Sequence, residues 1–275
     1  MPDARWKPTL LIRASMALHV LALPVLFAGP GLWRWVLGAV LANHILLALA
    51  GLWPRSDWLG PNWTRLPAAA AARNEIALTI DDGPDPVVTP QVLEVLEHYA
   101  ARATFFCIGE KAARYPDLCR EIVRRGHGLE NHSQHHRHTF AFLGYSGLMR
   151  ELQAGQETLC AIAGQRPLFF RAPAGLRNPL LDPVLNRLDL QLASWSVRGF
   201  DTQTGDAERV KSRLLRGLQA GAILLLHDGN AARTSKDIPV ILEVLPAVLA
   251  AAAAANLKFV TLRQAGGELK SRGTT

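Results

Sequence analysis

Two adjacent carboxylates, Asp81 and Asp82, follow a short apolar segment and precede a turn that contains glycine and proline. The alternating apolar residues from Ile76 to Ile80 predict a buried strand that ends at these carboxylates. Ligands and catalytic groups gather at such strand ends in barrels and open α/β sheets. If the turn aims both side chains into one cavity, one carboxylate can bind a cation while the other accepts a proton. The alternative is a solvated turn that caps the next helix.

A histidine-rich segment, residues 130–138 (ENHSQHHRH), follows another predicted strand. His132 and His136 are four residues apart, so on a helical turn they would share a face and reach one metal ion. Neutral imidazole is a common zinc ligand, and an added aspartate would complete a three-ligand site with room for water. His135 and His138 form a competing pair, and a solvated basic cluster is the alternative without a metal.

Charged groups also end later predicted strands, at Arg171 and at His227. Arg171 could hold a carboxylate through its guanidinium fork and keep it ionised, or it could form a structural salt bridge. A lone histidine at the end of an apolar strand is usually a core residue. Because His227 is one of several polar strand ends, an acid/base role is favoured.

Predicted strands and helices alternate from residue 75 onward, which is typical of βα units in a parallel sheet or barrel. The strands are expected at residues 75–80, 103–108, 127–131, 168–172, 190–196, 222–227 and 257–262. The helices are expected near residues 90–100, 110–125, 145–163, 178–188, 206–219 and 239–255.

Taken in order, four segments resemble the motifs of the NodB-type polysaccharide deacetylases, carbohydrate esterase family 4. The segments are TIDDGP (79–84), HSQHH (132–136), RAPAG (171–175) and LLHD (225–228). The resemblance covers roughly residues 74–264. It implies an α/β fold, a distorted (β/α) barrel, and metal-dependent hydrolysis of the N-acyl group of an amino sugar.

The resemblance also assigns roles to residues. The implied ligands of a divalent metal, with zinc the expected ion, are Asp82, His132 and His136. The implied catalytic group comprises Asp81 as base, Arg171 as the residue that orients it, His227 as general acid and Asp201 as the residue that tunes His227. The implied oxyanion and substrate contacts are Pro173, Ala174, Arg198 and Leu225.

Three positions depart from the family pattern. Ala174 stands where the family usually has tyrosine, so one wall of the substrate groove is lost while a backbone donor is kept. Arg198 stands where the family often has aspartate, and Thr202 where it often has tryptophan. These changes predict an altered acyl pocket and an anionic, phosphate-bearing sugar as substrate.

Residues 10–28 and 32–53 are two apolar runs separated by Gly29-Pro30-Gly31. Each is close to the ~20 residues that a helix needs to cross a bilayer. A membrane hairpin is the favoured interpretation. The alternatives are one span with an interfacial segment, a signal peptide, or two buried core helices. Tryptophans lie near the edges of the runs, as interfacial aromatic residues do: Trp33, Trp35, Trp53, Trp58 and Trp63.

Basic residues flank the hairpin on its outer ends. Those before it are Arg5, Lys7 and Arg13, those after it are Arg55, Arg65 and Arg73, and only Arg34 lies between the runs. By the positive-inside rule this distribution places both ends, and the catalytic domain, on the cytoplasmic side of a bacterial inner membrane.

The expected organisation is a membrane hairpin at 1–53, an interfacial linker at 54–74 and a NodB-like deacetylase domain at 75–275. The net charge of +7 suits an anionic partner such as a membrane surface or a phosphate-bearing lipid. The sequence shows no nucleic-acid-binding module, and no segment predicts a protein partner. The three cysteines are widely spaced and form no disulfide framework.

The favoured function is deacylation of an N-acetylated or N-formylated sugar on a polyprenyl-phosphate carrier, during modification of lipid A or a surface glycan. One alternative is a deacetylase outside the membrane that acts on peptidoglycan or an exopolysaccharide. Another is a catalytically silent barrel that binds glycan or scaffolds a synthase.

Overall fold

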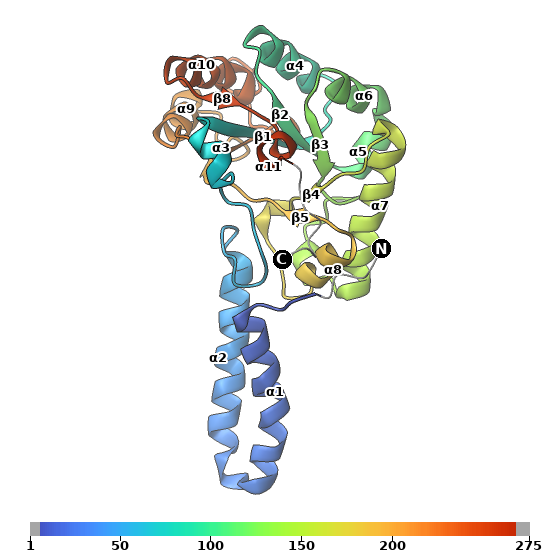
Figure 1. The fold of residues 1–275 in the computed structure, drawn as a ribbon, viewed down its shortest axis with the longest axis vertical. Coiled ribbons are helices and arrows are strands. Elements are labelled where there is room, and N and C mark those ends of the chain that lie inside the picture. Colours follow the sequence, from blue (N-terminus) through green and yellow to red (C-terminus); the bar gives the residue numbers. More distant parts are fainter. Residues whose placement is uncertain (1–5, 268–275) are drawn as a thin grey trace.

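A helical hairpin projects from one end of an α/β domain (Figure 1). The computed structural model describes residues 6–267, so Arg5 and the outermost ends of the first and last predicted units lie outside the described residues. The hairpin consists of α1 (Leu10–Ala28), the 3₁₀ turn η1 (Pro30–Leu32) and α2 (Trp33–Leu52). Both helices are long and apolar enough to cross a membrane, and only 11% of each apolar window is buried within the protein. Between the helices, Asn43 Nδ2 donates to Ser15 Oγ at 2.9 Å.

The domain is built on a curled sheet in which every strand pairing is parallel. The strand order is β5-β4-β3-β2-β1-β7-β6, and β8 pairs with the start of β1. The strands are β1 (Glu75–Gly83), β2 (Ala103–Cys107), β3 (Gly128–Asn131), β4 (Phe169–Phe170), β5 (Gln191–Leu192), β6 (Val197–Arg198), β7 (Ile223–His227) and β8 (Lys258–Phe259). This sheet confirms the predicted distorted barrel.

Helices surround the curled sheet (Figure 1). They are α3 (Ala68–Ala72), α4 (Val88–His98), α5 (Gly109–Arg114), α6 (Pro116–Arg124), α7 (Tyr145–Ala163), α8 (Leu181–Arg187), α9 (Ala207–Arg216), α10 (Val240–Ala254) and α11 (Leu262–Gly266), with 3₁₀ turns η2 (Phe140–Phe142) and η3 (Pro173–Gly175). Local sequence sets several ends: the Asp206 side chain accepts from Arg209 N at the start of α9, and Gly164 ends α7 with φ 67°. The single helix expected near 110–125 is wrong, because the chain breaks at Tyr115 before Pro116.

The central strands β1 and β7 are buried on both faces, and alternate residues enter two different cores. Leu78 and Ile80 pack outward against a cluster that includes α4, α9 and α10. Ala77, together with Ile223 and Leu225 of β7, packs into an inner cluster with Phe106 and Trp195. Residues of odd number on β1 and β7 therefore face the inside of the curled sheet, and their carboxyl ends open into the same space.

The strand expected at 190–196 is wrong in its extent. The chain instead forms β5 at one edge of the sheet and β6 at the opposite edge, where β6 pairs with β7. The segment between them crosses the open side of the half-barrel. There Trp63 takes up strand-like pairing, with its N–H on Leu192 O and its carbonyl accepting from Ser194 N, both at 2.9 Å. The Trp63 ring packs edge-on against Phe169, so it lies against the domain core rather than in an interfacial belt.

The hairpin is packed directly onto the domain. Gly51, in the last turn of α2, lies so close to the Arg177 carbonyl that a Cβ atom there would overlap it, and Arg177 N donates to Gly51 O at 3.2 Å. Just after α2, Pro54 O accepts from Ser194 Oγ at 2.6 Å and from Asn62 Nδ2 at 2.9 Å. The hairpin is thus fixed to the loop that follows β4.

Candidate metal centre and active site

A β-bulge at the end of β1 brings both aspartates into one pocket. On a regular strand, neighbouring side chains point to opposite faces, so Asp82 would turn toward the helices. Asp81 pairs with Phe106 and Gly83 with Cys107, which leaves Asp82 as the extra residue, with φ 70°. A bulge re-aims side chains in this way. Both carboxylates line the same pocket of about 720 Å³, as the sequence predicted.

Two residues that the sequence analysis missed hold Asp82 in this position. Asn230 Nδ2 donates to Asp82 Oδ2 at 3.2 Å, and Lys111 Nζ donates to the Asp82 carbonyl oxygen at 2.8 Å. The backbone of Gly229 passes so close to Asp82 that a Cβ there would overlap the Asp82 carbonyl. The turn-forming residues that follow His227 are the only sign of these contacts in the sequence, because contacts between distant segments leave no local sequence pattern.

His132 and His136 reach Asp82 from the loop after β3. His132 Nε2 lies 3.2 Å from Asp82 Oδ1, and His136 Nε2 lies 3.1 Å from the same oxygen. The expected helical turn is wrong, because Ser133 and His136 have φ values of 65° and 49°. Ser133 Oγ accepts from His136 N at 3.0 Å, so it stabilises a tight turn instead of starting a helix.

The arrangement of Asp82, His132 and His136 fits a divalent cation. Their ligand atoms lie within 4.8 Å of one another, and no other such group of three occurs among residues 6–267. Two ligands at zinc distances and a tetrahedral angle are about 3.3 Å apart, close to the observed separations. Asp82 Oδ1 is buried and receives no hydrogen bond. Such an acceptor, surrounded by imidazole nitrogens, calls for a positive ion.

The protonation of these groups also suits a cation. His132 Nδ1 lies 2.8 Å from the Arg171 carbonyl, so this nitrogen carries the proton and the lone pair of Nε2 faces Asp82. The competing pair is not formed, since His135 Nδ1 lies 2.9 Å from Glu151 instead.

Arg171 holds Asp81 beside the candidate metal centre. Its Nη1 donates to Asp81 Oδ1 at 2.7 Å and to Thr79 Oγ1 at 2.8 Å. The predicted two-point fork is wrong, because the other guanidinium nitrogens donate to the carbonyls of Ala193 and Ser194. The Arg171 side chain is 1% exposed, and its three nitrogens donate four hydrogen bonds to fixed acceptors. Removing one partner of such a buried pair typically costs about 3–5 kcal/mol.

His227 faces the same pocket from the end of β7. Asp201 Oδ1 lies 2.9 Å from His227 Nδ1, and Asp201 Oδ2 accepts from His227 N at 2.7 Å. This two-point contact leaves Nε2 toward the pocket. Burial alone would lower the pKa of His227, but the charge and hydrogen bond of Asp201, with the charges of Asp81 and Asp82, raise it.

The other predicted contacts divide between the pocket and its surroundings. Ala174 and Arg198 line the pocket, together with Thr202. Leu225 does not line it, because it is buried in the inner core one layer below His227. Pro173 is buried and lines a neighbouring apolar cavity.

Arg198 is held between two aromatic rings. Its guanidinium carbon lies 5.4 Å from the centre of the Trp195 ring and 5.1 Å from that of Phe200. Its Nε is buried without a hydrogen-bond partner. The side chain is therefore positioned beside the pocket with an unused donor.

Asp228 is a buried carboxylate that the sequence analysis did not place in the site. It accepts from Thr89 Oγ1 and, at 2.9 Å, from Gly229 N, and its carboxylate packs against Gly83. Burial raises the pKa of Asp228 to about 7, although both hydrogen bonds oppose this shift. It supports the turn behind Asp82 and does not line the catalytic pocket.

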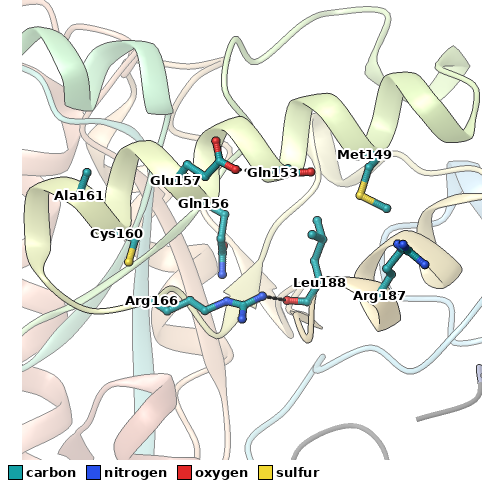
Figure 2. Close-up of a pocket in the computed structure, with 9 residues that line it drawn as sticks. All are labelled: Met149, Gln153, Gln156, Glu157, Cys160, Ala161, Arg166, Arg187 and Leu188. Atoms are coloured by element: carbon teal, nitrogen blue, oxygen red, sulfur yellow. Dashed lines mark hydrogen bonds between the residues drawn. The ribbon is translucent and has the colours of Figure 1, made fainter. Parts of the chain in front are cut away.

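A separate depression lies over α7 and contains none of the predicted site residues (Figure 2). Gln153, Glu157 and Cys160 line it from the helix, opposite Arg166 and Leu188. Within it, Gln153 donates to Glu157 at 2.8 Å, and Arg166 donates to the Leu188 carbonyl. The predicted ligands and the predicted acid and base, Asp81 and His227, lie instead at the pocket at the strand ends.

Comparison with known sequences identifies the family. The sequence model of the polysaccharide deacetylase family matches residues 68–193. A peptidoglycan-N-acetylglucosamine deacetylase of Bacillus cereus is 33% identical over 173 residues, which cover 62% of this chain and 80% of that protein. The chain belongs to the NodB-type polysaccharide deacetylases. A chitooligosaccharide deacetylase of Azorhizobium caulinodans is 36% identical over 165 residues, 59% of this chain and 78% of that one.

Solved structures agree with this assignment. A peptidoglycan N-acetylglucosamine deacetylase superposes with a TM-score of 0.66 at 26% identity, covering 73% of this chain and 90% of that one. A family 4 carbohydrate esterase from Streptomyces lividans gives 0.61 at 29% identity, covering 67% and 91%. This polysaccharide deacetylase is accordingly a hydrolase of carbohydrate amides. A family 4 pseudoenzyme from Bacillus anthracis shares the fold, with a TM-score of 0.64 at 22% identity over 71% of this chain and 66% of that one.

The geometry predicts which histidine is needed to bind the metal ion. His136→Gln should lower the affinity for a divalent cation by more than about 100-fold, beyond the effect of losing an outer-shell partner. His135→Gln is the matched control, since His135 is adjacent but bonds Glu151. Competition with a chelator, followed by elemental analysis of the retained metal, measures both. Equal affinities in the two variants would contradict the assignment.

Proposed function

We propose that this protein removes an N-acetyl or N-formyl group from an amino sugar carried on polyprenyl phosphate, during modification of lipid A or a surface glycan. One observation carries the hydrolytic part. The ligand atoms of Asp82, His132 and His136 lie within 4.8 Å of one another. Asp81 and His227, which is held by Asp201, line the same pocket. Amide hydrolysis requires this combination of an electrophilic centre, a proton acceptor and a proton donor.

The ligand set matches a divalent cation, for which zinc is our assignment because two imidazoles and one carboxylate suit it. When bound, such an ion polarises the acyl oxygen and lowers the pKa of the attacking water. Asp81 is the proton acceptor for that water. Arg171 keeps the Asp81 carboxylate aimed into the pocket, because its guanidinium is itself fixed by backbone carbonyls.

The remaining groups act on the two ends of the breaking amide. The backbone N–H of Ala174 is proposed to donate to the developing oxyanion, with Pro173 fixing the turn that presents it. His227 protonates the departing sugar amine, since an amide does not readily expel an unprotonated amine. Asp201 holds the His227 ring by Nδ1 and stabilises its charged form until that proton is transferred.

The lipid-linked substrate is favoured by the way the hairpin is attached. Residues 1–53 are assigned as a membrane hairpin, 54–74 as the interfacial segment and 75–275 as the deacetylase domain. Gly51 of α2 bonds directly to the loop that also carries Arg171 and Ala174. The pocket would therefore be held close to the membrane surface, where a lipid-linked sugar is located. A flexible tether would be expected if the substrate were a distant polymer.

The orientation follows from charge. Basic residues flank the hairpin at Lys7, Arg13, Arg55 and Arg65, with Arg34 alone near the connecting turn. The positive-inside rule then assigns the domain to the cytoplasmic face of the inner membrane.

Arg198 is proposed to recognise a negative charge on the substrate. It lies at the pocket with a buried Nε that bonds nothing, and the rings of Trp195 and Phe200 keep it in place. A phosphate or carboxylate would satisfy this donor.

Peptidoglycan or an exopolysaccharide outside the membrane is the second candidate substrate. It is favoured by the names of the relatives, which include peptidoglycan-N-acetylglucosamine and chitooligosaccharide deacetylases. An exported reporter fused after Trp63 would favour this alternative. A silent, glycan-binding barrel is disfavoured because the full set of acid/base and ligand groups is present in one pocket.

Loss of the proton acceptor should abolish the reaction. In cells with Asp81→Asn, lipid-linked amino sugars should keep their acyl group, whereas wild type should yield the free amine. Mass spectrometry of extracted lipid-linked sugars measures this difference. The control is Asp85→Asn on the same turn, where the side chain only accepts backbone N–H groups of Val87 and Val88 and asparagine caps equally well. Unchanged products in the Asp81 variant would exclude the proposed base.

The His227–Asp201 pair predicts a shift in pH dependence. Asp201 raises the pKa of His227 against the opposing effect of burial, so Asp201→Asn should lower that pKa. The protonated acid is then lost at lower pH, so the alkaline limb of kcat/KM should move to lower pH. The Asp206→Asn control, at the start of α9, should leave the profile unchanged. A limb that does not move would mean that His227 is not the group being titrated.

The charge of Arg198 should matter most for a phosphate-bearing substrate. Arg198→Ala should reduce kcat/KM for a polyprenyl-phosphate-linked N-acetylglucosamine by about tenfold or more, the size expected for a hydrogen bond to a charged group. The loss should be smaller for neutral N-acetylchitotetraose. Arg216→Ala removes an exposed arginine and serves as control. An equal loss on both substrates would argue against recognition of the anion.

A further inference from the structure

A second cavity, of about 740 Å³, lies between the hairpin and the catalytic domain. One wall is the last part of α2, from His44 to Leu52, where Leu47, Ala48 and Gly51 face the cavity. The other walls are the loop 136–144 after β3 and the loop 173–180 after β4. Both of these loops also contribute residues to the catalytic pocket.

The cavity adjoins the catalytic pocket. His136, His138 and Ala174 line both spaces. Ala174 is exposed between them, and its methyl group is the whole of the side chain at that point. A molecule whose polar end lies in the catalytic pocket can therefore continue past Ala174 into the second cavity.

The walls of the second cavity are mainly hydrocarbon. Phe140, Leu143, Leu176 and Leu180 line it from the domain side. Phe142 lines it as well and is 87% exposed, an unusual state for a large apolar side chain outside the hairpin. At its far end the cavity opens along α2, whose remaining surface is apolar and exposed.

We infer that this cavity binds the hydrocarbon chain of the lipid-linked substrate, in the part nearest the sugar phosphate. The inference rests on the proposed function and adds where the lipid lies. The chain would pass from the bilayer along the C-terminal half of α2, about 10 Å from His44 to Gly51, and place the sugar past Ala174 at the candidate metal centre. A soluble glycan would make no use of a continuous apolar path from a membrane helix to a hydrolytic pocket. Selectivity for a lipid carrier is thus built into the junction between hairpin and domain.

The test fills the cavity from a residue outside the catalytic pocket. Ala48→Trp places a large ring in the cavity, and Ala42→Trp makes the same change at an exposed position of α2 that does not line it. The full-length protein is assayed in detergent with polyprenyl-phosphate-linked N-acetylglucosamine and with N-acetylchitotetraose. The ratio of kcat/KM for the lipid-linked over the soluble substrate should fall at least tenfold in Ala48→Trp and stay constant in Ala42→Trp. An unchanged ratio in Ala48→Trp overturns the inference.

A second variant tests whether the effect of Ala48→Trp comes from filling the cavity or from a local folding defect. Gly144 lies on the opposite wall, and a Cβ there would meet no atom within 4 Å, so Gly144→Trp also fills the cavity without displacing a neighbour at its first atom. It should lower the same ratio. Thermal unfolding of each variant shows whether it is folded.

A photoreactive polyprenyl phosphate separates failure of this inference from failure of the proposed function. If wild type does not hydrolyse the lipid-linked sugar, the proposed substrate is wrong, but labelling can still locate the hydrocarbon. Crosslinks within 44–52 or 139–144 that are lost in Ala48→Trp support the cavity as a lipid site. Crosslinks elsewhere, or equal labelling in both tryptophan variants, overturn it.

Discussion

The bulge at Asp82 is the constraint on which the site depends. Side chains alternate between the two faces of β1, so Ala77 and Asp81 point inward while Leu78 and Ile80 point toward the outer helices. Without the extra residue, a ligand carboxylate adjacent to Asp81 would be directed into a hydrocarbon core, where an ion is costly. The positive φ of Asp82 is stabilised by contacts from Lys111 in α5 and from Gly229 and Asn230 in the loop after β7, so two separate segments support the strained backbone.

The pocket balances charge by giving each carboxylate a different cation. Asp81 is paired with Arg171, Asp201 with His227, and Asp82 faces the two imidazoles of the candidate metal centre. Because the partners differ, the carboxylates do not share one proton or one role. The same pairing accompanies the burial of Arg171, whose guanidinium connects Asp81 to the carbonyls of Ala193 and Ser194 across the open side of the barrel.

The junction between the hairpin and the domain couples two parts that otherwise have separate cores. Gly51 allows α2 to touch the loop after β4, and Pro54 accepts a hydrogen bond from Ser194 on the far edge. Movement of α2 would therefore act on the loop that carries Arg171 and Ala174. The catalytic pocket and the apolar cavity are parts of one structure that includes the apolar helices.

The sequence by itself determined the βα alternation, the two apolar helices and the strand ends that carry Asp81, Asp82, Arg171 and His227, because these follow from periodicity and from short ordered motifs. Prediction from the sequence failed where contacts with distant segments determine the local structure. The backbone of the His132–His136 turn, the single-point contact of Arg171 and the burial of Leu225 each depend on neighbours far away in the chain. Only the tertiary structure revealed Asn230, Lys111 and the cavity beside α2, since packing across loops and strands leaves no local pattern to read.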